Sequence, residues 1–406
     1  MDEKLKIYNG RVVTPGRIIP SGTVLIMGET IREVTEDNID LPGVVEIDAR
    51  GHYISPGFID LHVHGGGGYD FMDGTVDAFL EIAKLHAMYG TTSMLPTTLT
   101  AGRQKLLQAL AAYEAASALN GSGAQFLGMH IEGPYIAMNQ KGAQDPRFIR
   151  DPDEKEYEEI VSGSNKNIKR WSAAPELKGA LKFGRYLMSR GILPSIAHSD
   201  ATYKDVCEAF ESGYTHITHF YSAMSGVTRI GASRYAGVIE SGYLIDEMTL
   251  EIIADGVHLP EPLLKLVYKI KGAERTALIT DAIRATGTSA KETVLGDREN
   301  GIKVIVEDGV AKLPDRSCFA GSVATADRLV RTMINLADLP LSEALQMITA
   351  TPAGIIAVND KKGSLMPGKD ADIVIFDDNI TIQTTIIKGK VVYKRNEAEK
   401  IIKDLA

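Results

Sequence analysis

The sequence contains very little cysteine. Cys207 and Cys318 are the only two among 406 residues, and they stand far apart. The first ten residues, MDEKLKIYNG, also lack the basic start and the apolar stretch of a secretory signal peptide. Together, the isolated cysteines and the missing signal predict a cytoplasmic protein.

The sequence also lacks long apolar runs and basic blocks. No stretch approaches the roughly 18 uninterrupted apolar residues of a membrane span. The formal net charge is -9, and no segment is rich in Lys and Arg. We therefore expect neither a membrane nor a nucleic acid as partner, and any anionic substrate must be met by local positive groups. Hydrophobic residues make up 44% and charged residues 24%, which is typical of soluble globular proteins.

The two ends of the chain show the same sequence pattern. Residues 1–56 contain short β-rich runs (KIYNGRVV, GTVLIMG, VVEIDA) separated by Gly, Pro and Asn, which predicts a small antiparallel β unit. Similar runs return in ADIVIFDD and TIQTTIIKGKVVYK near the C-terminus. We expect residues 1–57 and 361–406 to form one small β-sandwich domain.

Between these ends, apolar β-like runs alternate with helical stretches. This alternation over residues 58–360 predicts an α/β fold, a (β/α)8 TIM barrel, because the even count and the length favour closure over a doubly wound sheet. Residues 286–320 form an insertion after the eighth run, with a hairpin predicted at Asp308-Gly309. The eight runs begin at residues 58 (FIDLHVHG), 90, 124, 171, 192, 215, 249 and 276 (TALITDAI).

Polar residues gather where these runs end. In a barrel the strand ends and the loops after them form the active site. Among the eight polar residues at such positions, four histidines and two carboxylates form a nitrogen and oxygen ligand set that suits Zn²⁺, Fe²⁺, Mn²⁺ or Co²⁺. The strand-end residues are His62, His64, Glu132, His198, His219, Asp255, His258 and Asp281.

The segment GFIDLHVHGGGGYD places His62 and His64 on one strand face, with Asp60 one layer deeper. An HxH pair alone is a weak indication of a metal site. The histidines and carboxylates at the other strand ends strengthen it. We expect the glycines at 65–68 to turn the chain sharply and to approach a ligand closely.

The remaining histidines are expected to be structural. His52 precedes the barrel, His86 lies in a helix, and His130 is two residues before Glu132. His216, three residues before His219, is expected on the opposite strand face. Asp281 follows a buried run, so it either caps a helix beginning at Ala282 or serves as the proton acceptor of a hydrolase.

Several sequence motifs resemble those of a known family. PGFIDLHVHGGGG, GMHIEGPYI, KGAQDP, AHSDATY, THFYSAM, IADGVHLP, LITDAIRATG and KGSLMPGKDADIVIFD resemble the N-acetylglucosamine-6-phosphate deacetylases of the amidohydrolase superfamily. The resemblance covers nearly the whole chain and implies a barrel with a β-sandwich built from both ends. It also implies deacetylation of N-acetylglucosamine 6-phosphate to glucosamine 6-phosphate and acetate.

The resemblance assigns roles to individual residues. It implies one or two divalent ions, with Zn or Fe first and Mn or Co as alternatives. Asp281 is implied as catalytic aspartate and metal neighbour, and His258 as a substrate contact that polarises the acetamide carbonyl. Gly142 and Ala143 match the loop beside the sugar, and Phe319 is expected in the acetyl pocket. The implied ligands are Glu132, His198 and His219 for the catalytic ion, with His62 and His64 for a second ion that Glu132 bridges.

Phosphate recognition departs from the family pattern. The family reads NAM followed by REPG, whereas this chain has Ser222-Ala223-Met224 and then SGVTRIGASRYAG. The backbone amides of Ser222 and Ala223 remain able to donate to phosphate, and Arg229 or Arg234 is the candidate to replace the missing arginine. Because that arginine comes from the neighbouring subunit in the family, a homodimer is implied.

This departure leaves other substrates open. N-acetylgalactosamine 6-phosphate and an N-acyl amino acid are the alternatives within the same chemistry. A non-catalytic scaffold descended from an amidohydrolase is a third interpretation, and the complete set of ligands argues against it.

Overall fold

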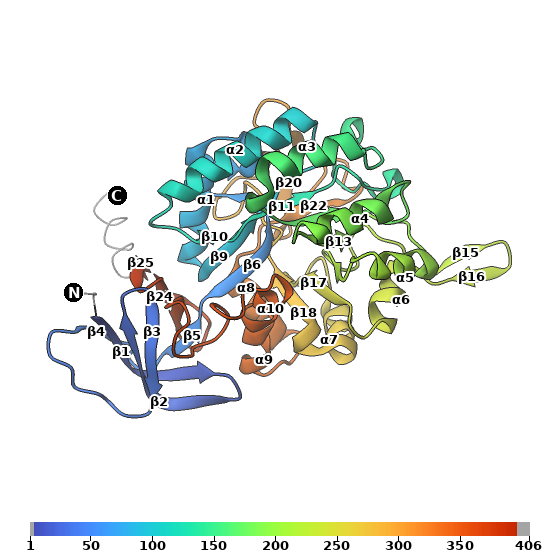
Figure 1. Ribbon diagram of the computed structural model, residues 1–406. Helices are drawn as coiled ribbons and strands as arrows, with labels where there is room; N and C mark the ends of the chain where they lie inside the picture. The colour runs from blue at the N-terminus through green and yellow to red at the C-terminus, as the bar shows by residue number, and fades with distance from the viewer. Residues whose placement is uncertain (1–3, 396–406) are drawn as a thin grey trace.

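Eight short parallel strands surround one axis in the computed structural model, which describes residues 4–395 (Figure 1). They form two hydrogen-bonded groups, β6 with β9 and the series β11-β12-β13-β14-β17-β18. The bridges Thr97↔His130 and Val63↔Ala282 close the circle between the groups. The predicted barrel is therefore confirmed. Its strands are β6 (Phe58–Val63), β9 (Thr91–Pro96), β11 (Met129–Glu132), β12 (Ile168–Ala173), β13 (Leu193–Ile196), β14 (His216–Ile217), β17 (Thr249–Ile253) and β18 (Thr276–Ile279).

A helix follows each strand and covers the outside of the barrel (Figure 1). Local sequence starts several of them: the Thr75 hydroxyl accepts from the Ala78 amide, and Thr202 forms a capping box with Asp205. Within residues 4–395, no helix is long and apolar enough to cross a membrane. The helices are α1 (Val76–Met88), α2 (Arg103–Leu119), α3 (Glu154–Ser164), α4 (Ala180–Ser189), α5 (Tyr203–Glu211), α6 (Val238–Leu244), α7 (Glu261–Arg275) and α8 (Ala326–Asn335), then α9 (Leu341–Gln346) and α10 (Ala350–Ile355).

The two chain ends join in one β unit, as predicted for the β-sandwich, and in the structure this unit is one mixed sheet. Its order is β25-β24-β23-β5-β1-β2-β3, with β4 also beside β1. The expected antiparallel unit is in fact mixed, because β1 pairs with both β4 and β5 in parallel, and alternation of residues does not reveal pairing direction. The strands are β1 (Lys4–Thr14), β2 (Arg17–Met27), β3 (Thr30–Thr35), β4 (Val45–Asp48), β5 (Tyr53–Pro56), β23 (Ile373–Phe376), β24 (Ile382–Ile387) and β25 (Lys390–Lys394).

This end sheet has its own apolar core. Ile7, Val24, Ile54, Ile373 and Ile386 are all buried within it. The predicted domain limits of 1–57 and 361–406 include residues 1–3 and 396–406, which lie outside the described residues.

Two β insertions extend from the barrel. The predicted hairpin is present: β20 (Ile302–Glu307) pairs with β21 (Val310–Lys312) across Asp308 and Gly309, which both have positive φ. β19 (Glu292–Leu295) and β22 (Phe319–Ser322) complete this four-stranded sheet. A second hairpin, β15 (Thr228–Ile230) with β16 (Ser233–Tyr235), projects away from the barrel (Figure 1).

Candidate metal centre

The strand ends bring the predicted chemical residues to one place. A cavity of 740 Å³ is lined by His64, Glu132, His198, His219, His258 and Asp281. His62 lies directly beneath it and is fully buried. The elements that supply these residues are β6, β11 and the segments immediately after β13, β14, β17 and β18.

Three of these residues have unusual backbone conformations. His198, His219 and Asp281 have φ of 47°, 29° and 47°, a left-handed region that non-glycine residues rarely adopt. Such conformations cluster at functional sites, where surrounding packing holds them. Each residue lies just past a strand, so the backbone turns there and strand alternation no longer decides where the side chain points.

This turn corrects the prediction for His216. Strand parity placed it on the face opposite His219, yet its Nε2 lies 3.2 Å from Oε2 of Glu251, inside the barrel. His219 also points inward, because its positive φ reverses the expected direction. Both histidines therefore belong to the barrel interior, with His216 in a deeper layer.

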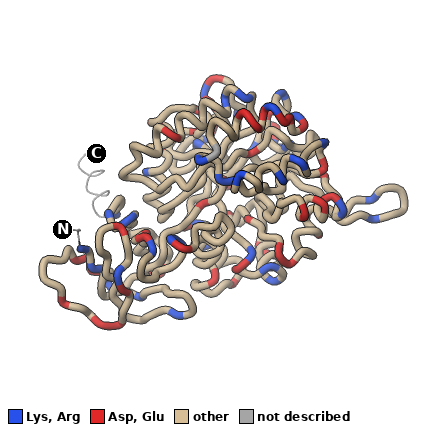
Figure 2. Tube along the Cα trace, in the orientation of Figure 1, with Lys and Arg blue, Asp and Glu red and all other residues tan. Residues whose placement is uncertain are grey.

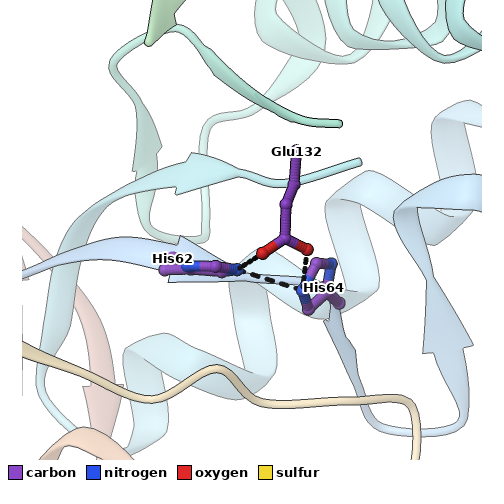
Figure 3. A group of neighbouring side chains, drawn as sticks. All are labelled: His62, His64 and Glu132. Atoms are coloured by element: carbon purple, nitrogen blue, oxygen red, sulfur yellow. Dashed lines mark hydrogen bonds and ion pairs between the residues drawn. The ribbon is translucent and has the colours of Figure 1, made fainter. Parts of the chain in front are cut away.

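The ligand atoms converge on two overlapping groups. His62, His64 and Glu132 form one group, and Glu132, His198 and His219 form the other, with the candidate ligand atoms of each group within 4.8 Å of one another. Figure 3 shows both imidazoles and the carboxylate of the first group pointing toward each other. Oε1 of Glu132 lies 3.0 Å from Nε2 of His219, and Oε2 lies 3.5 Å from Nε2 of His64. Glu132 thus stands between the two histidine pairs.

Hydrogen bonds behind the rings decide which nitrogen faces the centre. Nδ1 of His64 lies 3.3 Å from the carbonyl oxygen of Thr97, and Nδ1 of His198 lies 2.7 Å from that of Gln140. A carbonyl only accepts, so each Nδ1 carries the proton and each Nε2 presents a lone pair.

The Nε2 atoms of the histidines face one another in pairs. The Nε2 atoms of His62 and His64 are 3.1 Å apart, and those of His198 and His219 are 3.3 Å apart. Two lone pairs at that separation repel unless a proton or a cation lies between them. This buried set of imidazoles and a carboxylate therefore fits a divalent metal ion.

Without an ion, the charges of the centre shift one another. Burial lowers the pKa of His62, but Glu132 and Asp281 outweigh burial and raise it to about 10. Burial raises the pKa of Glu132, and the surrounding histidines, His62 foremost, hold it well below the usual range. The His62–His64–Glu132 group therefore favours a bound positive charge, as a proton or as a metal ion.

Asp281 is placed beside the first group. Its Oδ1 lies 3.2 Å from Nε2 of His64 and 3.5 Å from Nε2 of His62. Burial raises its pKa, but these histidines lower it more, so the carboxylate is ionised at neutral pH. The alternative role as a helix cap is absent, because no helix begins at Ala282.

His258 lines the same cavity and has a carboxylate behind it. Its Nδ1 donates to Oδ2 of Asp255 at 2.8 Å, while the amides of Val257 and His258 donate to Oδ1. Burial raises the pKa of Asp255, but the bonds from His258 lower it more. The ring of His258 packs 4.5 Å from that of Phe319, between ring centroids. Nε2 of His258 is left as the ring atom available to a substrate.

The predicted substrate residues divide into two sets. Gly142, Ala143, Ser222, Ala223 and Phe319 line the cavity. Arg229 and Arg234 do not: they face each other as register partners on the exposed hairpin β15–β16, outside the cavity of their own chain.

The charge pattern of that hairpin is distinctive. Figure 2 shows basic and no acidic positions along it, in agreement with its sequence VTRIGASRYA. Val227, Ile230 and Tyr235 are also exposed on it, so the hairpin combines positive charge with apolar side chains.

Sequence reasoning missed two cations that do line the cavity. Lys312 and Arg316 belong to the insertion after β18, and both pair with Glu307, at 3.1 and 2.8 Å. Residues after a hairpin turn have no periodic signal that points toward a cavity, so only the fold reveals them.

The glycines after His64 have a different role from the one expected. Gly65 and Gly66 (β7) pair with Tyr69 and Asp70 (β8), and 67–68 form the turn. A Cβ at Gly65 would lie 2.3 Å from the Tyr69 carbonyl oxygen and 2.9 Å from the Arg284 amide. These glycines are not among the cavity-lining residues, so they permit a close approach to protein backbone and not to a ligand.

The other predicted structural histidines contact protein groups. Nε2 of His86 lies 3.0 Å from the Gly65 carbonyl oxygen, and Nε2 of His130 lies 2.5 Å from the Ser172 hydroxyl. Asp60 lies below the centre, where it accepts from the hydroxyl of Thr280.

Comparison with known proteins places the chain. The amidohydrolase family model matches residues 53–392. N-acetylglucosamine-6-phosphate deacetylase of Bacillus subtilis (strain 168) is 32% identical over 405 residues, covering 99% of this chain and 100% of that protein. The chain belongs to the N-acetylglucosamine-6-phosphate deacetylase family of amidohydrolases. The resemblance found in the sequence motifs is thus confirmed.

Two further members of this family group are informative. N-acetylgalactosamine-6-phosphate deacetylase of Escherichia coli O157:H7 is 33% identical over 348 residues, covering 86% of this chain and 89% of that one. The structure of an N-acetyl-D-glucosamine-6-phosphate deacetylase mutant from Mycobacterium smegmatis, in complex with N-acetyl-D-glucosamine-6-phosphate, has a TM-score of 0.88 at 27% identity. The match between the two structures covers 97% of this chain and 100% of the Mycobacterium smegmatis chain.

Proposed function

We propose that this protein is a metal-dependent deacetylase that converts N-acetylglucosamine 6-phosphate to glucosamine 6-phosphate and acetate. The observation that carries the proposal is the convergence of four histidine Nε2 atoms, Glu132 and Asp281 on one cavity at the strand ends. A non-catalytic scaffold has no need of this buried, mutually repelling set.

The centre would hold two divalent ions, with Glu132 between them. His198, His219 and Glu132 would bind the catalytic ion, and His62 and His64 the second, with Asp281 beside it. Zn²⁺ or Fe²⁺ suits this set first, and Mn²⁺ or Co²⁺ also fits it. When bound, such an ion lowers the pKa of a coordinated water toward about 7 and polarises a carbonyl oxygen.

Asp281 would move the proton. Its carboxylate is ionised, lies at the edge of the cavity and is held by His64, so it can accept the proton of the attacking water. The same carboxyl group then returns that proton to the departing amine. His258, oriented by Asp255, would donate to the acetamide oxygen from Nε2 as negative charge develops there.

The rest of the cavity would bind the sugar and its phosphate. Gly142 and Ala143 would contact the sugar, Phe319 would contact the acetyl methyl group, and the amides of Ser222 and Ala223 would donate to phosphate. Lys312 and Arg316 supply positive charge to the lining of the same cavity. Their pairing with Glu307 reduces that charge, so a further cation would strengthen the phosphate site.

Arg229 and Arg234 would supply this charge from a neighbouring subunit. Their hairpin projects from its own barrel, so its arginines can serve a cavity only in a second copy of the chain (Figure 1). The exposed Val227, Ile230 and Tyr235 suit burial against that copy. We therefore propose a homodimer with shared sites, and the cytoplasmic location stays a prediction of the sequence.

N-acetylgalactosamine 6-phosphate is the second candidate substrate. The specific observation in its favour is the E. coli N-acetylgalactosamine-6-phosphate deacetylase, which at 33% identity is as similar to this chain as the N-acetylglucosamine-6-phosphate deacetylase of Bacillus subtilis (strain 168) at 32%. The two sugars differ only in the configuration at C4, so the reaction at the metal centre is unchanged.

The test is release of free amine by metal-quantified protein from three sugars in parallel: N-acetylglucosamine 6-phosphate, N-acetylgalactosamine 6-phosphate and unphosphorylated N-acetylglucosamine. We expect the highest kcat/KM on the first and a loss of about 100-fold or more without phosphate, because a charged hydrogen-bonding site is then left unpaired. Preference for the second sugar would support the alternative. Failure on all three with metal bound would contradict the proposed function.

A further inference from the structure

A buried ion pair lies beneath the metal centre and outside the cavity. Arg170 on β12 and Glu251 on β17 are both 0% exposed. Nη1 and Nη2 of Arg170 donate to the two carboxylate oxygens of Glu251, at 2.5 and 2.7 Å. Arg170 also donates to the hydroxyls of Ser195 and Thr218. Because burying such a pair rarely increases stability, its presence calls for another explanation.

The carboxylate of Glu251 reaches the back of the metal centre. Its Oε1 accepts from Nδ1 of His62 at 3.1 Å and from the backbone amide of His219 at 3.4 Å. Its Oε2 lies 3.2 Å from Nε2 of His216. Glu251 therefore contacts two candidate ligand residues from the side that a metal ion does not reach.

The four histidines differ in what holds Nδ1. His64 and His198 have backbone carbonyls there, and Nδ1 of His219 has no hydrogen-bond partner within the described residues. Among these four, His62 alone has a carboxylate. A carboxylate behind an imidazole fixes the tautomer with its lone pair on Nε2 and makes that nitrogen a stronger ligand.

We propose that Glu251, clamped by Arg170, is a positioning residue that gives the His62–His64–Glu132 group its affinity for a second metal ion. The proposal rests on the proposed function, in which the centre binds two ions. Arg170 contributes by fixing both carboxylate oxygens, so that Oε1 stays on Nδ1 of His62. A purely structural ion pair between β12 and β17 would instead affect folding without favouring one ion over the other.

The test compares metal binding in the wild type, Glu251→Gln and Asp372→Asn. Asp372 is a matched control, because it is also a buried carboxylate paired with a cation, Lys362, but lies away from the metal centre, just before β23 of the end sheet. Each full-length protein is equilibrated at a series of buffered free Co²⁺ concentrations. Bound ions per subunit are then measured by mass spectrometry, and the visible Co²⁺ spectrum reports the occupied geometry.

We expect two ions in the wild type and in Asp372→Asn. In Glu251→Gln, the second ion should bind about 10- to 100-fold more weakly, while the first binds with little change. A folded Glu251→Gln protein that takes up both ions with wild-type affinity would overturn the inference alone. A wild type that never binds a second ion would overturn both the inference and the two-ion part of the proposed function.

A second variant covers the case in which Glu251→Gln does not fold. Arg170→Met with Glu251→Leu removes both charges, so no buried charge is left unpaired. The same selective loss of the second ion is expected there. Two tightly bound ions in the folded double variant would overturn the inference.

Discussion

The metal centre and the hairpin β15–β16 are opposite kinds of structure in one chain. In the centre every candidate ligand is buried, and three of the four histidine rings are held from behind by a hydrogen bond. In the hairpin both strands are exposed along their whole length and pair only with each other. The difference shows that the candidate ligands are built into the barrel, and under the proposed function recognition of the anion would be carried by segments that can change without disturbing them.

Removing the metal should have the largest effect on activity, because it acts on the buried centre and leaves the hairpin unchanged. We expect dialysis against a chelator to lower deacetylation by about 1000-fold or more, because water is then no longer activated. Adding Zn²⁺ or Co²⁺ should restore it. The measurement is turnover alongside metal content, with the Arg229→Ala/Arg234→Ala protein as a control that should bind metal normally. Full activity of metal-free protein would contradict the account.

Folding stability should separate the buried and exposed arginines next. Arg170→Met leaves Glu251 buried without its partner, and we expect it to lose about 3 to 5 kcal/mol of unfolding free energy. Arg229→Ala/Arg234→Ala should change it by less than about 0.5 kcal/mol, since exposed side chains contribute little. Urea unfolding of the two variants measures the difference, and equal losses would remove the distinction between the regions.

For substrate affinity we expect the opposite ranking, in which the exposed arginines matter more than the buried Arg170. We expect Arg229→Ala/Arg234→Ala to raise KM for the phosphorylated sugar by about 10- to 100-fold, the value of a charged hydrogen bond, with kcat nearly unchanged. Lys312→Ala should have a smaller effect, because Lys312 is already paired with Glu307 and Asp308.

Mixed subunits test whether the arginines act across the dimer. Asp281→Asn subunits combined with Arg229→Ala/Arg234→Ala subunits should regain activity, since one site in the hybrid keeps both the base and the partner's arginines. No gain over the separate variants, in a confirmed hybrid, would place the arginines outside the site.

The smallest effect is expected at the joint between the end sheet and the barrel, remote from both regions. Asp372 accepts from Lys362 and from Gln125, and burial raises its pKa although Lys362 opposes the rise. The folded protein therefore binds this proton more tightly than the unfolded chain does. The stability that Asp372 contributes is present below its unfolded pKa of about 3.9 and is lost as the pH rises through the folded value.

The side chain in Asp372→Asn does not titrate, so the variant lacks this loss of stability. Its stability relative to the wild type should therefore increase as the pH rises from about 4 to 7, as urea unfolding at several pH values would show. A difference that is independent of pH, or that runs the other way, would contradict the assignment.

The sequence predicted most of the centre because its signals are local. Strand ends fix where His62, His64 and Glu132 lie, and the alternation of runs fixes the barrel. It failed where the chain turns: the positive φ of His219, just after β14, directs that side chain inward although His216 also lies inside the barrel, and glycines 65–68 serve backbone packing. Glu251 and Arg170 were missed although each is an ionisable residue inside a buried strand, a signal that the sequence does offer.

The proposed mechanism depends on Asp281 as the strand-end carboxylate that moves the proton at an intact metal centre. The turnover of Asp281→Asn on N-acetylglucosamine 6-phosphate, with bound metal counted in the same sample, measures this dependence. We expect a loss of about 100-fold or more in kcat, with His198, His219 and Glu132 still holding their ion. Near wild-type turnover by a metal-loaded Asp281→Asn protein would contradict it.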